Sequence, residues 1–404
     1  MSAPPGFPIN RPTPSAMKLP PLVTTLAPLS GEELTRYSRH ILLPEIGLTG
    51  QQRLKAARVL VVGAGGLGSP ALLYLAAAGV GTLGVIDFDR VDVSNLQRQV
   101  IHRMSTVGMP KTVSARNAII ALNPHVDVRL HDERLDNDNA IPLLSQYDLI
   151  LDGTDNFATR YLVNDACVLA GKPYVWGSIY RFEGQASVFW EDAPHDAGLN
   201  YRDLYPEPPP PHLAPSCAEG GVLGVLCASI SSIMATEAVK LITGAGNSLL
   251  GRLVVYDALD MRYRFLPLRR APQRRPIVSL DDYSRLCGLA THAERVRVPA
   301  IDALALKQLL DAGQPVELVD VREPTEWELV RIPGAKLMPK RQLLDENGLA
   351  TLDRTRRTVV YCKGGARSRD VVEVMRRAGF ADVSNLDGGI LSWIRTVDPS
   401  LPQY

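Results

Sequence analysis

A short apolar run followed by closely spaced glycines constrains the fold of this chain more than any other feature. Residues 58–62 (Arg-Val-Leu-Val-Val) have the β-branched pattern of a buried parallel strand, and residues 63–68 (Gly-Ala-Gly-Gly-Leu-Gly) follow at once. Glycines let the backbone turn sharply without a Cβ clash. Residues 67–78 then have helical spacing, so the free N–H groups of a helix start point at whatever binds there. Strand, glycine turn and helix together predict a nucleotide site.

The next strands support a nucleotide-binding sheet. Residues 83–87 end in Asp87, at the distance from the glycines where dinucleotide folds place an acid that binds a ribose hydroxyl. Strand and helix patterns keep alternating as far as residue 178, with further strands predicted at 126–130, 149–152 and 174–178. This alternation predicts an α/β fold with a mostly parallel, doubly covered sheet. Residues 185–190 alternate polar and apolar side chains and predict an antiparallel extension.

Composition excludes several classes of protein. A net charge of +1 over 404 residues argues against a nucleic-acid partner, and the basic run at 262–275 is interpreted as solvated linker. The longest apolar stretch, 222–242, is interrupted by serines, Glu237 and Lys240, so it predicts a buried helix and no membrane span. Five cysteines at irregular spacing and the absence of a signal pattern predict a reducing, cytoplasmic location.

Changes in composition divide the chain into parts. Residues 1–28 are Pro-rich and predict a flexible lead, residues 29–268 form the first domain, and residues 269–298 form a linker. Residues 299–404 form a smaller α/β domain, with helices predicted at 301–311 and 366–378 and strands at 316–320 and 358–361. Within the first domain, the Pro-rich stretch 193–218 predicts a long loop of functional importance.

Charged residues beyond Asp87 favour a triphosphate over a nicotinamide cofactor. Arg98 and Lys111 follow the second strand, and a dehydrogenase has no need of two such cations there. They suit the β- and γ-phosphates of ATP, whose pyrophosphate they would stabilise as it leaves. Residues 152–156 (Asp-Gly-Thr-Asp-Asn) end another strand at the same edge of the sheet, and their acids could hold Mg²⁺. A surface ion pair is the alternative for each charge taken alone.

In combination these motifs resemble the ATP site of the E1-like enzymes of the MoeB and ThiF group, over residues 30–268. The resemblance implies a Rossmann-like adenylation domain, with Arg98 and Lys111 acting in catalysis and Asp155 binding Mg²⁺ together with ATP. Arg39 matches an arginine that in the family reaches the partner subunit's nucleotide, which implies a homodimer. The nucleotide contacts implied are Gly63, Gly65, Gly66, Gly68, Asp87, Ser94, Asn95, Leu96, Gln97, Arg98, Lys111, Asp155 and Asn156.

The family resemblance also implies a reaction, the adenylation of the C-terminal carboxylate of a ubiquitin-like sulfur carrier (MoaD, ThiS or CysO type) that ends in Gly-Gly. A carboxylate is already nucleophilic at pH 7, so alignment and charge neutralisation suffice without a general base. Cys217 follows the Pro-rich stretch at a predicted helix start, where the pKa of a thiol is lowered. The resemblance makes it the candidate thiol that attacks the acyl-adenylate or resolves a sulfur intermediate. Cys167 and Cys227 lie in helical patterns and are interpreted as buried structural residues.

One departure from the family concerns a metal. Many relatives carry two Cys-x-x-Cys pairs that bind a structural zinc. The corresponding residues here are Asn-Tyr-Arg-Asp at 200–203 and Ser-Arg-Leu-Cys at 284–287. One of the four ligands remains, so we expect no structural zinc.

The second domain carries a cysteine loop. Residues 361–368 (Tyr-Cys-Lys-Gly-Gly-Ala-Arg-Ser) follow a strand and open a helix, so backbone N–H groups can surround the Cys362 sulfur and favour a thiolate or a persulfide. This loop resembles the active loop of rhodanese-type sulfurtransferases, and residues 320–327 and 332–335 match the other signatures of that family. A cysteine phosphatase would place arginine six positions after the cysteine, where Ser368 stands. An inert, degenerate domain is the third interpretation.

Adenylation domain plus rhodanese domain resembles the fused enzymes of the MoeZ type. This resemblance implies an adenylyltransferase and sulfurtransferase in which Cys362 takes sulfur from thiosulfate or from a cysteine desulfurase persulfide and leaves a thiocarboxylate on the carrier. Molybdenum cofactor, thiamine, cysteine and tRNA-thiolation pathways all stay open. The alternatives are a nicotinamide-dependent oxidoreductase with an accessory rhodanese domain, and a non-catalytic docking protein for a ubiquitin-like partner.

Overall fold

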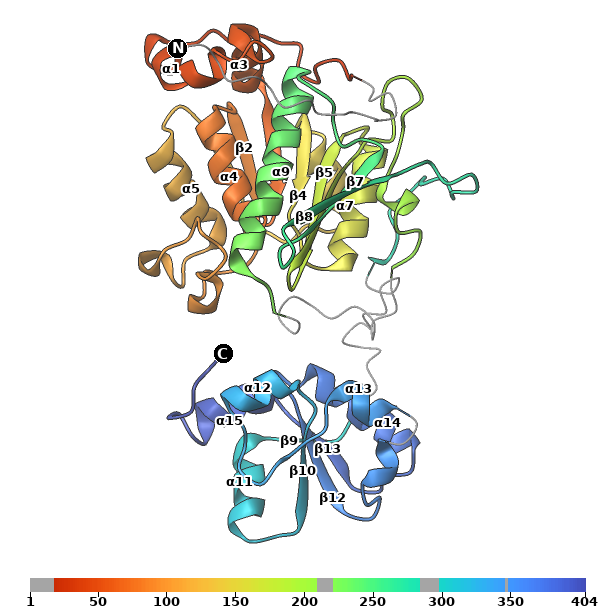
Figure 1. The fold of residues 1–404 in the computed structure, drawn as a ribbon. Coiled ribbons are helices and arrows are strands. Elements are labelled where there is room, and N and C mark those ends of the chain that lie inside the picture. Colours follow the sequence, from red (N-terminus) through yellow and green to blue (C-terminus); the bar gives the residue numbers. More distant parts are fainter. Residues whose placement is uncertain (1–17, 209–220, 284–297, 346–347) are drawn as a thin grey trace. The chain divides into compact units, whose positions relative to one another are not determined.

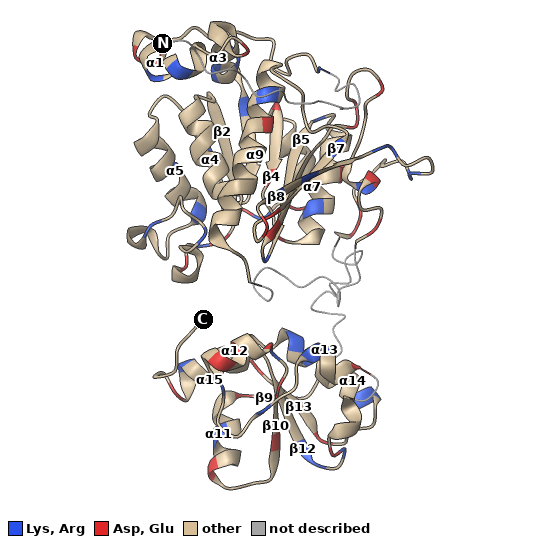
Figure 2. Cartoon of the chain, viewed as in Figure 1, with Lys and Arg blue, Asp and Glu red and all other residues tan. Residues whose placement is uncertain are grey.

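The computed structural model describes residues 18–208, 221–283, 298–345 and 348–404. The chain divides into two compact units, residues 1–290 and residues 291–404 (Figure 1). Each unit has its own sheet and its own hydrophobic cores. In the view of Figure 2, basic and acidic residues are interspersed over both units rather than separated by sign, in line with the net charge of +1.

An eight-stranded sheet forms the centre of the first unit, in the order β3-β2-β1-β4-β5-β6-β7-β8. The pairs from β3 to β5 are parallel, and β6, β7 and β8 extend the sheet in antiparallel fashion. This confirms the predicted Rossmann-like, mostly parallel sheet. The strands are β1 (Arg58–Val62), β2 (Thr82–Ile86), β3 (Asp127–His131), β4 (Leu149–Asp152), β5 (Tyr174–Tyr180), β6 (Glu183–Phe189), β7 (Arg252–Asp257) and β8 (Arg262–Pro267).

Helices cover both faces of this sheet because each central strand is apolar on both sides. On β1, Val59 and Val61 belong to the hydrophobic core shared with α3, α4 and α9, whereas Leu60 and Val62 belong to the core shared with α6 and α7. The alternation of side chains along the strand produces this division. The helices are α1 (Gly31–Arg36), α2 (Ser38–Ile41), α3 (Gly47–Ala56), α4 (Gly68–Ala78), α5 (Lys111–Leu122), α6 (Ala140–Leu144), α7 (Phe157–Leu169) and α9 (Gly224–Thr243), with 3-10 helices η1 (Val93–Asn95), η2 (Met104–Thr106) and η3 (Tyr201–Asp203).

Helix α9 corresponds to the apolar stretch of the sequence. Within the described residues it is the one helix long and apolar enough to cross a membrane by length and composition. It packs against α4, β5 and β6, and Leu226, Ile230 and Met234 are fully buried there. These contacts are those of a core helix in a globular unit, as the polar interruptions of the sequence predicted.

The described part of the apolar stretch begins at residue 221. The sequence predicted a helix from Gly220 onward, and α9 begins at Gly224, after Val222, which forms an isolated β-bridge with Arg181. The lowered thiol pKa that the sequence predicted at Cys217 stays a prediction. Cys217 itself lies outside the described residues.

The second unit holds a five-stranded, wholly parallel sheet in the order β11-β10-β12-β13-β9. Its central strand β12 ends at Tyr361, so Cys362 leaves the carboxyl end of the sheet. The strands are β9 (Ala300–Ile301), β10 (Val316–Asp320), β11 (Lys336–Leu337), β12 (Arg357–Tyr361) and β13 (Val383–Leu386). The helices are α11 (Ala303–Asp311), α12 (Pro324–Leu329), α13 (Lys340–Leu344), α14 (Ala366–Arg377) and α15 (Gly389–Thr396), with a 3-10 helix η5 (Leu349–Thr351).

Glycine is required at position 68, where the turn meets α4. A Cβ placed on Gly68 would lie 1.8 Å from the carbonyl oxygen of Gly63, and a backbone atom cannot move aside. We predict that Gly68→Ala destabilises the first unit by about 3 kcal/mol or more, because the clash must be relieved by moving the turn. Urea unfolding followed by hydrogen exchange of peptides from β1 and α4 measures the effect.

Gly31→Ala is the matched control, because a Cβ on Gly31 meets nothing within 4 Å. It should change stability by less than about 0.5 kcal/mol. Equal stabilities for the two variants would contradict the proposed role of the turn.

Candidate functional site

A cleft of about 660 Å³ opens at the carboxyl ends of β1, β2 and β4. Ligands of open α/β sheets bind at this edge. The cleft brings together eight residues predicted from the sequence: Gly63, Gly65, Gly66, Asp87, Arg98, Lys111, Asp155 and Asn156.

A buried carboxylate fixes the glycine turn at the floor of the cleft. Asp87 Oδ2 accepts a hydrogen bond from the N–H of Ala64, and Oδ1 accepts one from the N–H of Asp89, both at 2.8 Å. Burial raises the pKa of the Asp87 carboxyl, while the charge of Lys111 and the two backbone N–H groups oppose that shift. Gly63 has φ = 89°, a left-handed conformation that favours glycine.

Two of the predicted residues that line the cleft are cations, Arg98 and Lys111. Lys111, the first residue of α5, is buried, and its Nζ lies 2.8 Å from Asp89 Oδ2. Arg98 follows η1, and its Nη1 donates to the carbonyl of Ser94 at 3.1 Å. A Cβ on Gly66 would lie only 3.7 Å from Arg98 Cγ, so the arginine packs directly on the glycine turn.

The other predicted nucleotide contacts do not line the cleft. Two of them take part in the capping box of the 3-10 helix η1: the N–H of Asp92 donates to Asn95 Oδ1, and the N–H of Ser94 donates to Asp92 Oδ1. Gly68 lies beneath the turn, at the start of α4. Leu96 and Gln97 are likewise absent from the cleft lining. The backbone of Gln97 lies close to the start of α9, since its carbonyl oxygen would be 2.4 Å from a Cβ placed on Gly224. Arg39 is exposed on α2 and does not line the cleft of its own chain.

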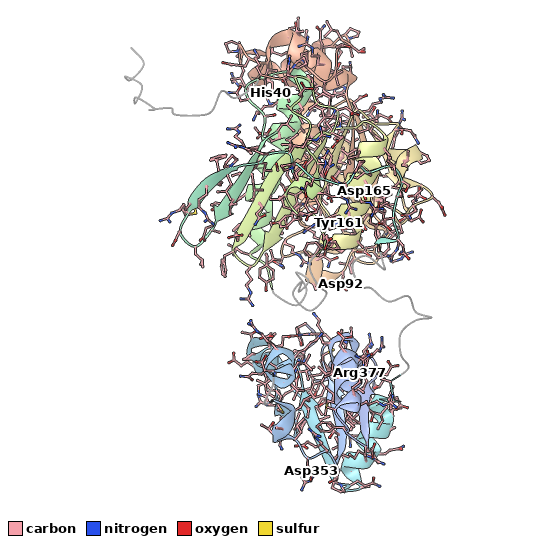
Figure 3. The ribbon with its side chains drawn as sticks, turned by 90° about the vertical axis from the view of Figure 1, so that its right-hand side faces the viewer. His40, Asp92, Tyr161, Asp165, Asp353 and Arg377 are labelled. Atoms are coloured by element: carbon pink, nitrogen blue, oxygen red, sulfur yellow. The ribbon has the colours of Figure 1, made fainter. Side chains whose placement is uncertain are left out.

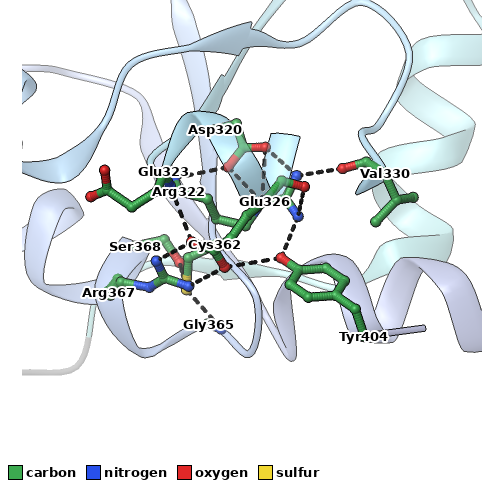
Figure 4. A network of polar contacts seen from close by, with 10 residues as sticks. All are labelled: Asp320, Arg322, Glu323, Glu326, Val330, Cys362, Gly365, Arg367, Ser368 and Tyr404. Carbon is green, nitrogen blue, oxygen red and sulfur yellow. Dashed lines mark hydrogen bonds and ion pairs between the residues drawn. The ribbon is translucent and has the colours of Figure 1, made fainter. Parts of the chain in front are cut away.

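A second polar site surrounds Cys362 in the smaller unit (Figure 4). The N–H of Gly365 lies 3.1 Å from the Cys362 sulfur, and Ser368 Oγ lies 3.4 Å from it. Ser368 Oγ also donates to Asn385 Oδ1 at 2.6 Å, which fixes the hydroxyl. Gly365 has φ = 91°, so the loop needs glycine there to wrap its backbone around the sulfur.

Comparison with known proteins places the fold and both sites in a family. The model of the ThiF family matches residues 37–276. The chain belongs to the ThiF family. A rhodanese-like domain matches residues 302–396, which include Cys362.

The relatives of this ThiF-family chain are enzymes. It is 58% identical to a Mycobacterium tuberculosis protein named "Probable adenylyltransferase/sulfurtransferase MoeZ". The match covers 96% of this chain and 99% of that protein. It is 52% identical, over 64% of its length and 98% of the other, to a Thermus thermophilus protein named a sulfur carrier protein adenylyltransferase. A crystal structure of Escherichia coli MccB with ATP matches 61% of this chain and 74% of that one, with a TM-score of 0.53 and 21% identity, which shows a shared fold.

The chain is therefore an adenylyltransferase and sulfurtransferase with a ThiF domain followed by a rhodanese domain. The alternative of a nicotinamide-dependent oxidoreductase finds no support among these relatives.

Several residues that line the ThiF cleft were not predicted from the sequence. The Arg134 guanidinium carbon lies 4.2 Å from the centre of the Phe88 ring, and both residues belong to the cleft wall. Phe88 directly follows Asp87, and Arg134 follows the carboxyl end of β3, so their positions after neighbouring strands could have indicated them. Other lining residues outside the predicted site include Asp89, Gln99, Glu133, Leu135, Asp136, Asn137, Asp138, Gly153, Thr154 and Arg160.

A buried histidine outside the predicted set supports the turn of the ThiF domain. His102 Nε2 lies 2.9 Å from the carbonyl oxygen of Ala64, and its Nδ1 lies 2.9 Å from Ser114 Oγ on α5. Burial lowers the pKa of His102, so the ring is neutral at pH 7, and the proton sits on Nε2 because a carbonyl can only accept. No local sequence pattern marks this histidine.

The far wall of the cleft comes from residues that the sequence assigned to the linker. Tyr283 lines the cleft and donates from its hydroxyl to Asp165 Oδ2 at 2.9 Å. Asp165 lies one helical turn from Tyr161 on α7 (Figure 3) and also accepts from the Arg202 guanidinium at 2.7 Å. Asn137 Nδ2 donates to the carbonyl of Asp281 at 2.9 Å. The described part of the segment, up to Tyr283, thus packs on the ThiF domain.

The first of the two Cys-x-x-Cys positions carries polar side chains. Asp203 accepts from the N–H of Ala271 at 2.9 Å and forms an ion pair with Arg274, and Asn200 donates to Glu191 at 2.9 Å. The second position, 284–287, lies outside the described residues. Among the residues that the structure describes, no three His, Cys, Asp or Glu side chains gather to hold a metal.

The carboxylates of the cleft suit a magnesium ion bound with phosphates. Mg²⁺ in such sites takes one or two carboxylates and fills its other positions with phosphate oxygens and water. Asp155 is exposed at the cleft, whereas Asp152, three residues earlier, is fully buried and does not line the cleft. Asp155 is therefore the carboxylate that could hold the expected ion together with the phosphates.

We predict that His102 and His131 make the first unit less stable as the pH falls from about 7 to about 5. Burial lowers the pKa of both His102 and His131, so as the pH falls these side chains are protonated in the unfolded chain before they are protonated in the folded chain. Protonation therefore favours the unfolded state. His102→Asn should reduce the slope of stability against pH, measured by hydrogen exchange of peptides from β1 and α4 at each pH.

The smaller unit provides an internal control for this slope, because residues 298–404 contain no histidine. Peptides from β12 and α14 should show no corresponding change between the two proteins. An unchanged slope in His102→Asn would show that the histidine does not carry the effect.

Proposed function

We propose that the ThiF cleft uses ATP with Mg²⁺ to adenylate the C-terminal carboxylate of a ubiquitin-like sulfur carrier ending in Gly-Gly, and that Cys362 delivers the sulfur that turns this carboxylate into a thiocarboxylate. The observation that carries the proposal is the convergence of Arg98, Lys111 and the buried Asp87 in one cleft, in a chain that also holds a sulfur-wrapping loop. The name of the T. thermophilus relative supports a sulfur carrier as substrate, and the structure of E. coli MccB with ATP supports ATP as the nucleotide.

Adenylation requires placement and charge neutralisation. An oxygen of the carrier carboxylate attacks the α-phosphorus, the bond from that phosphorus to the bridging oxygen of the β-phosphate breaks, and pyrophosphate leaves with the electron pair. Arg98 and Lys111 line the cleft where they can neutralise the charge that grows on the leaving pyrophosphate. Asp155 would hold Mg²⁺, which neutralises further phosphate charge. Asp87, held in place by two backbone N–H groups, would bind the ribose.

Sulfur transfer then uses Cys362 as a persulfide. Its terminal sulfur attacks the acyl carbon, the bond to the phosphate oxygen breaks, and AMP leaves. The resulting acyl disulfide is opened by a second thiolate, which attacks the Cys362 sulfur and releases the thiocarboxylate. Cys217 is the candidate for this thiolate, and it lies outside the described residues. A dithiol reductant must then return the disulfide to two thiols.

The proposal also covers the setting of the enzyme. We expect a cytoplasmic homodimer in which the exposed Arg39 serves the partner subunit's cleft, with no bound zinc. The sulfur donor is thiosulfate or a cysteine desulfurase persulfide. Molybdenum cofactor biosynthesis is one proposed pathway, beside the thiamine, cysteine and tRNA-thiolation pathways.

We predict that incubation with ATP, a sulfur donor and a Gly-Gly carrier replaces one carboxylate oxygen of the carrier by sulfur. The expected readout is a carrier mass increased by the difference between sulfur and oxygen, located to the C-terminal glycine by tandem mass spectrometry. A carrier that lacks the last glycine serves as control. Failure with MoaD-, ThiS- and CysO-type carriers alike would refute the proposal.

Two substitutions should separate the two half-reactions. Lys111→Ala should slow carrier-dependent ATP–pyrophosphate exchange by about 100-fold, because one preorganised cation is lost from the transition state. Cys362→Ser should leave this exchange unchanged and abolish thiocarboxylate formation, because the acyl-adenylate still forms but no persulfide can attack it. If both variants lose pyrophosphate exchange, the assignment of separate roles to the two sites is wrong.

A further inference from the structure

The loop around Cys362 carries two cations, Lys363 and Arg367. Lys363 follows the cysteine directly, and its Nζ lies 4.6 Å from the centre of the Tyr404 ring. Arg367 stands one residue before Ser368, whose hydroxyl contacts the sulfur. The Arg367 guanidinium donates from Nη1 and Nη2 to the two carboxylate oxygens of Glu326, at 2.6 and 2.8 Å.

Glu326 is well placed to cancel the charge of Arg367. Both side chains of this ion pair are nearly buried, with 12% of Arg367 and 11% of Glu326 exposed. Burial raises the pKa of the Glu326 carboxyl, but the hydrogen bonds and charge of Arg367 outweigh this effect, so the pKa is lowered. Glu326 is therefore ionised at pH 7, and the pair has no net charge. Screening by solvent, which weakens exposed pairs, is small here.

The position of Glu326 is fixed by further contacts (Figure 4). Its Oε1 accepts from the Tyr404 hydroxyl at 3.0 Å, and its Oε2 accepts from the N–H of Glu323 at 3.1 Å. The fully buried Arg322 donates to the Tyr404 hydroxyl and to the backbone carbonyl of Glu326. A carboxylate held by this many donors cannot turn away from Arg367 without leaving several of them unpaired.

We propose that Glu326 is a specificity-determining residue that neutralises Arg367 and so lowers the reactivity of the Cys362 loop toward small anionic sulfur donors such as the thiosulfate dianion. A site of lower charge attracts dianions less strongly, which favours donors whose sulfane sulfur sits on a cysteine. The proposal rests on Cys362 being the sulfur-carrying residue of the proposed function.

The charge beside the sulfur can be measured without any sulfur donor. Iodoacetate and iodoacetamide alkylate the same thiolate, and they differ chiefly in charge. The ratio of their rates at Cys362, followed by mass spectrometry of the peptide in the full-length protein, therefore reports the local potential. Glu326→Gln should raise this iodoacetate-to-iodoacetamide ratio by about three- to tenfold at low salt, the effect of one partly screened unit charge. High salt should reduce the increase.

Glu328→Gln is the matched control, since Glu328 is exposed on the same helix and the change is chemically identical. It should leave the ratio unchanged. Arg367→Gln should lower the ratio, because it leaves the Glu326 carboxylate uncompensated, and the double variant should return the ratio close to that of the parent protein.

A purely structural role for Glu326 would change both alkylation rates by the same factor and leave the ratio as it was. That result would overturn the proposal. If Glu326→Gln fails to fold, the test passes to Arg367→Gln, and an unchanged iodoacetate-to-iodoacetamide ratio in that variant would overturn the proposal as well. The second readout is kcat/KM for thiosulfate in persulfide formation at Cys362, which should rise in Glu326→Gln. If Glu326→Gln raises the iodoacetate-to-iodoacetamide ratio but Cys362 forms no persulfide, the charge assigned to Glu326 is supported. The proposed role of Cys362 as the sulfur carrier is then contradicted.

Discussion

The hydrogen bonds that the buried carboxylate of Asp87 accepts from Ala64 and Asp89 hold the first active centre together. Ala64 is fully buried, so without this acceptor its N–H would lie unpaired in the interior. The carboxylate stands at the end of β2 and the turn at the end of β1, so one interaction joins two neighbouring strands at the ligand edge. Burial disfavours the charged carboxylate, and the nearby Lys111 opposes this effect. The cation that lines the cleft therefore also helps to stabilise its floor.

Both units use the same local solution to hold an anion. In each, a central parallel strand ends in a glycine-containing turn that leads into a helix, β1 into α4 and β12 into α14. Free N–H groups collect at such turns whatever the sequence of the strands. The difference lies in what stands within the turn. The ThiF turn leaves an open cleft of about 660 Å³, whereas the rhodanese turn closes around one sulfur atom, and Cys362 is only 2% exposed.

The sequence was sufficient for the features that short-range patterns determine. The strands, the glycine turn, Asp87 and the Cys362 loop follow from spacing and residue type, because parallel strands place their carboxyl ends at one edge. Contacts between residues distant in the chain left no such pattern. His102 supports Ala64 from 38 residues away, and Tyr283 reaches Asp165 across 118 residues. The wall formed by residues 281–283 was hidden for a second reason, since its proline- and arginine-rich approach has the composition of a linker.

The two centres also differ in how their cations are paired. The exposure of the carboxylate partner determines whether an incoming anion can take its place. Lys111 pairs with Asp89, whose side chain is 52% exposed, so water can replace the lysine at modest cost when a phosphate arrives. Arg367 pairs with a carboxylate that is 11% exposed and held by two further donors, so no small anion can displace it without leaving a buried charge unpaired. A cleft that must bind a polyanion keeps its lysine exchangeable. A loop that must hold a single sulfur, and later release it to an acyl carbon, gains from a cation that stays engaged elsewhere.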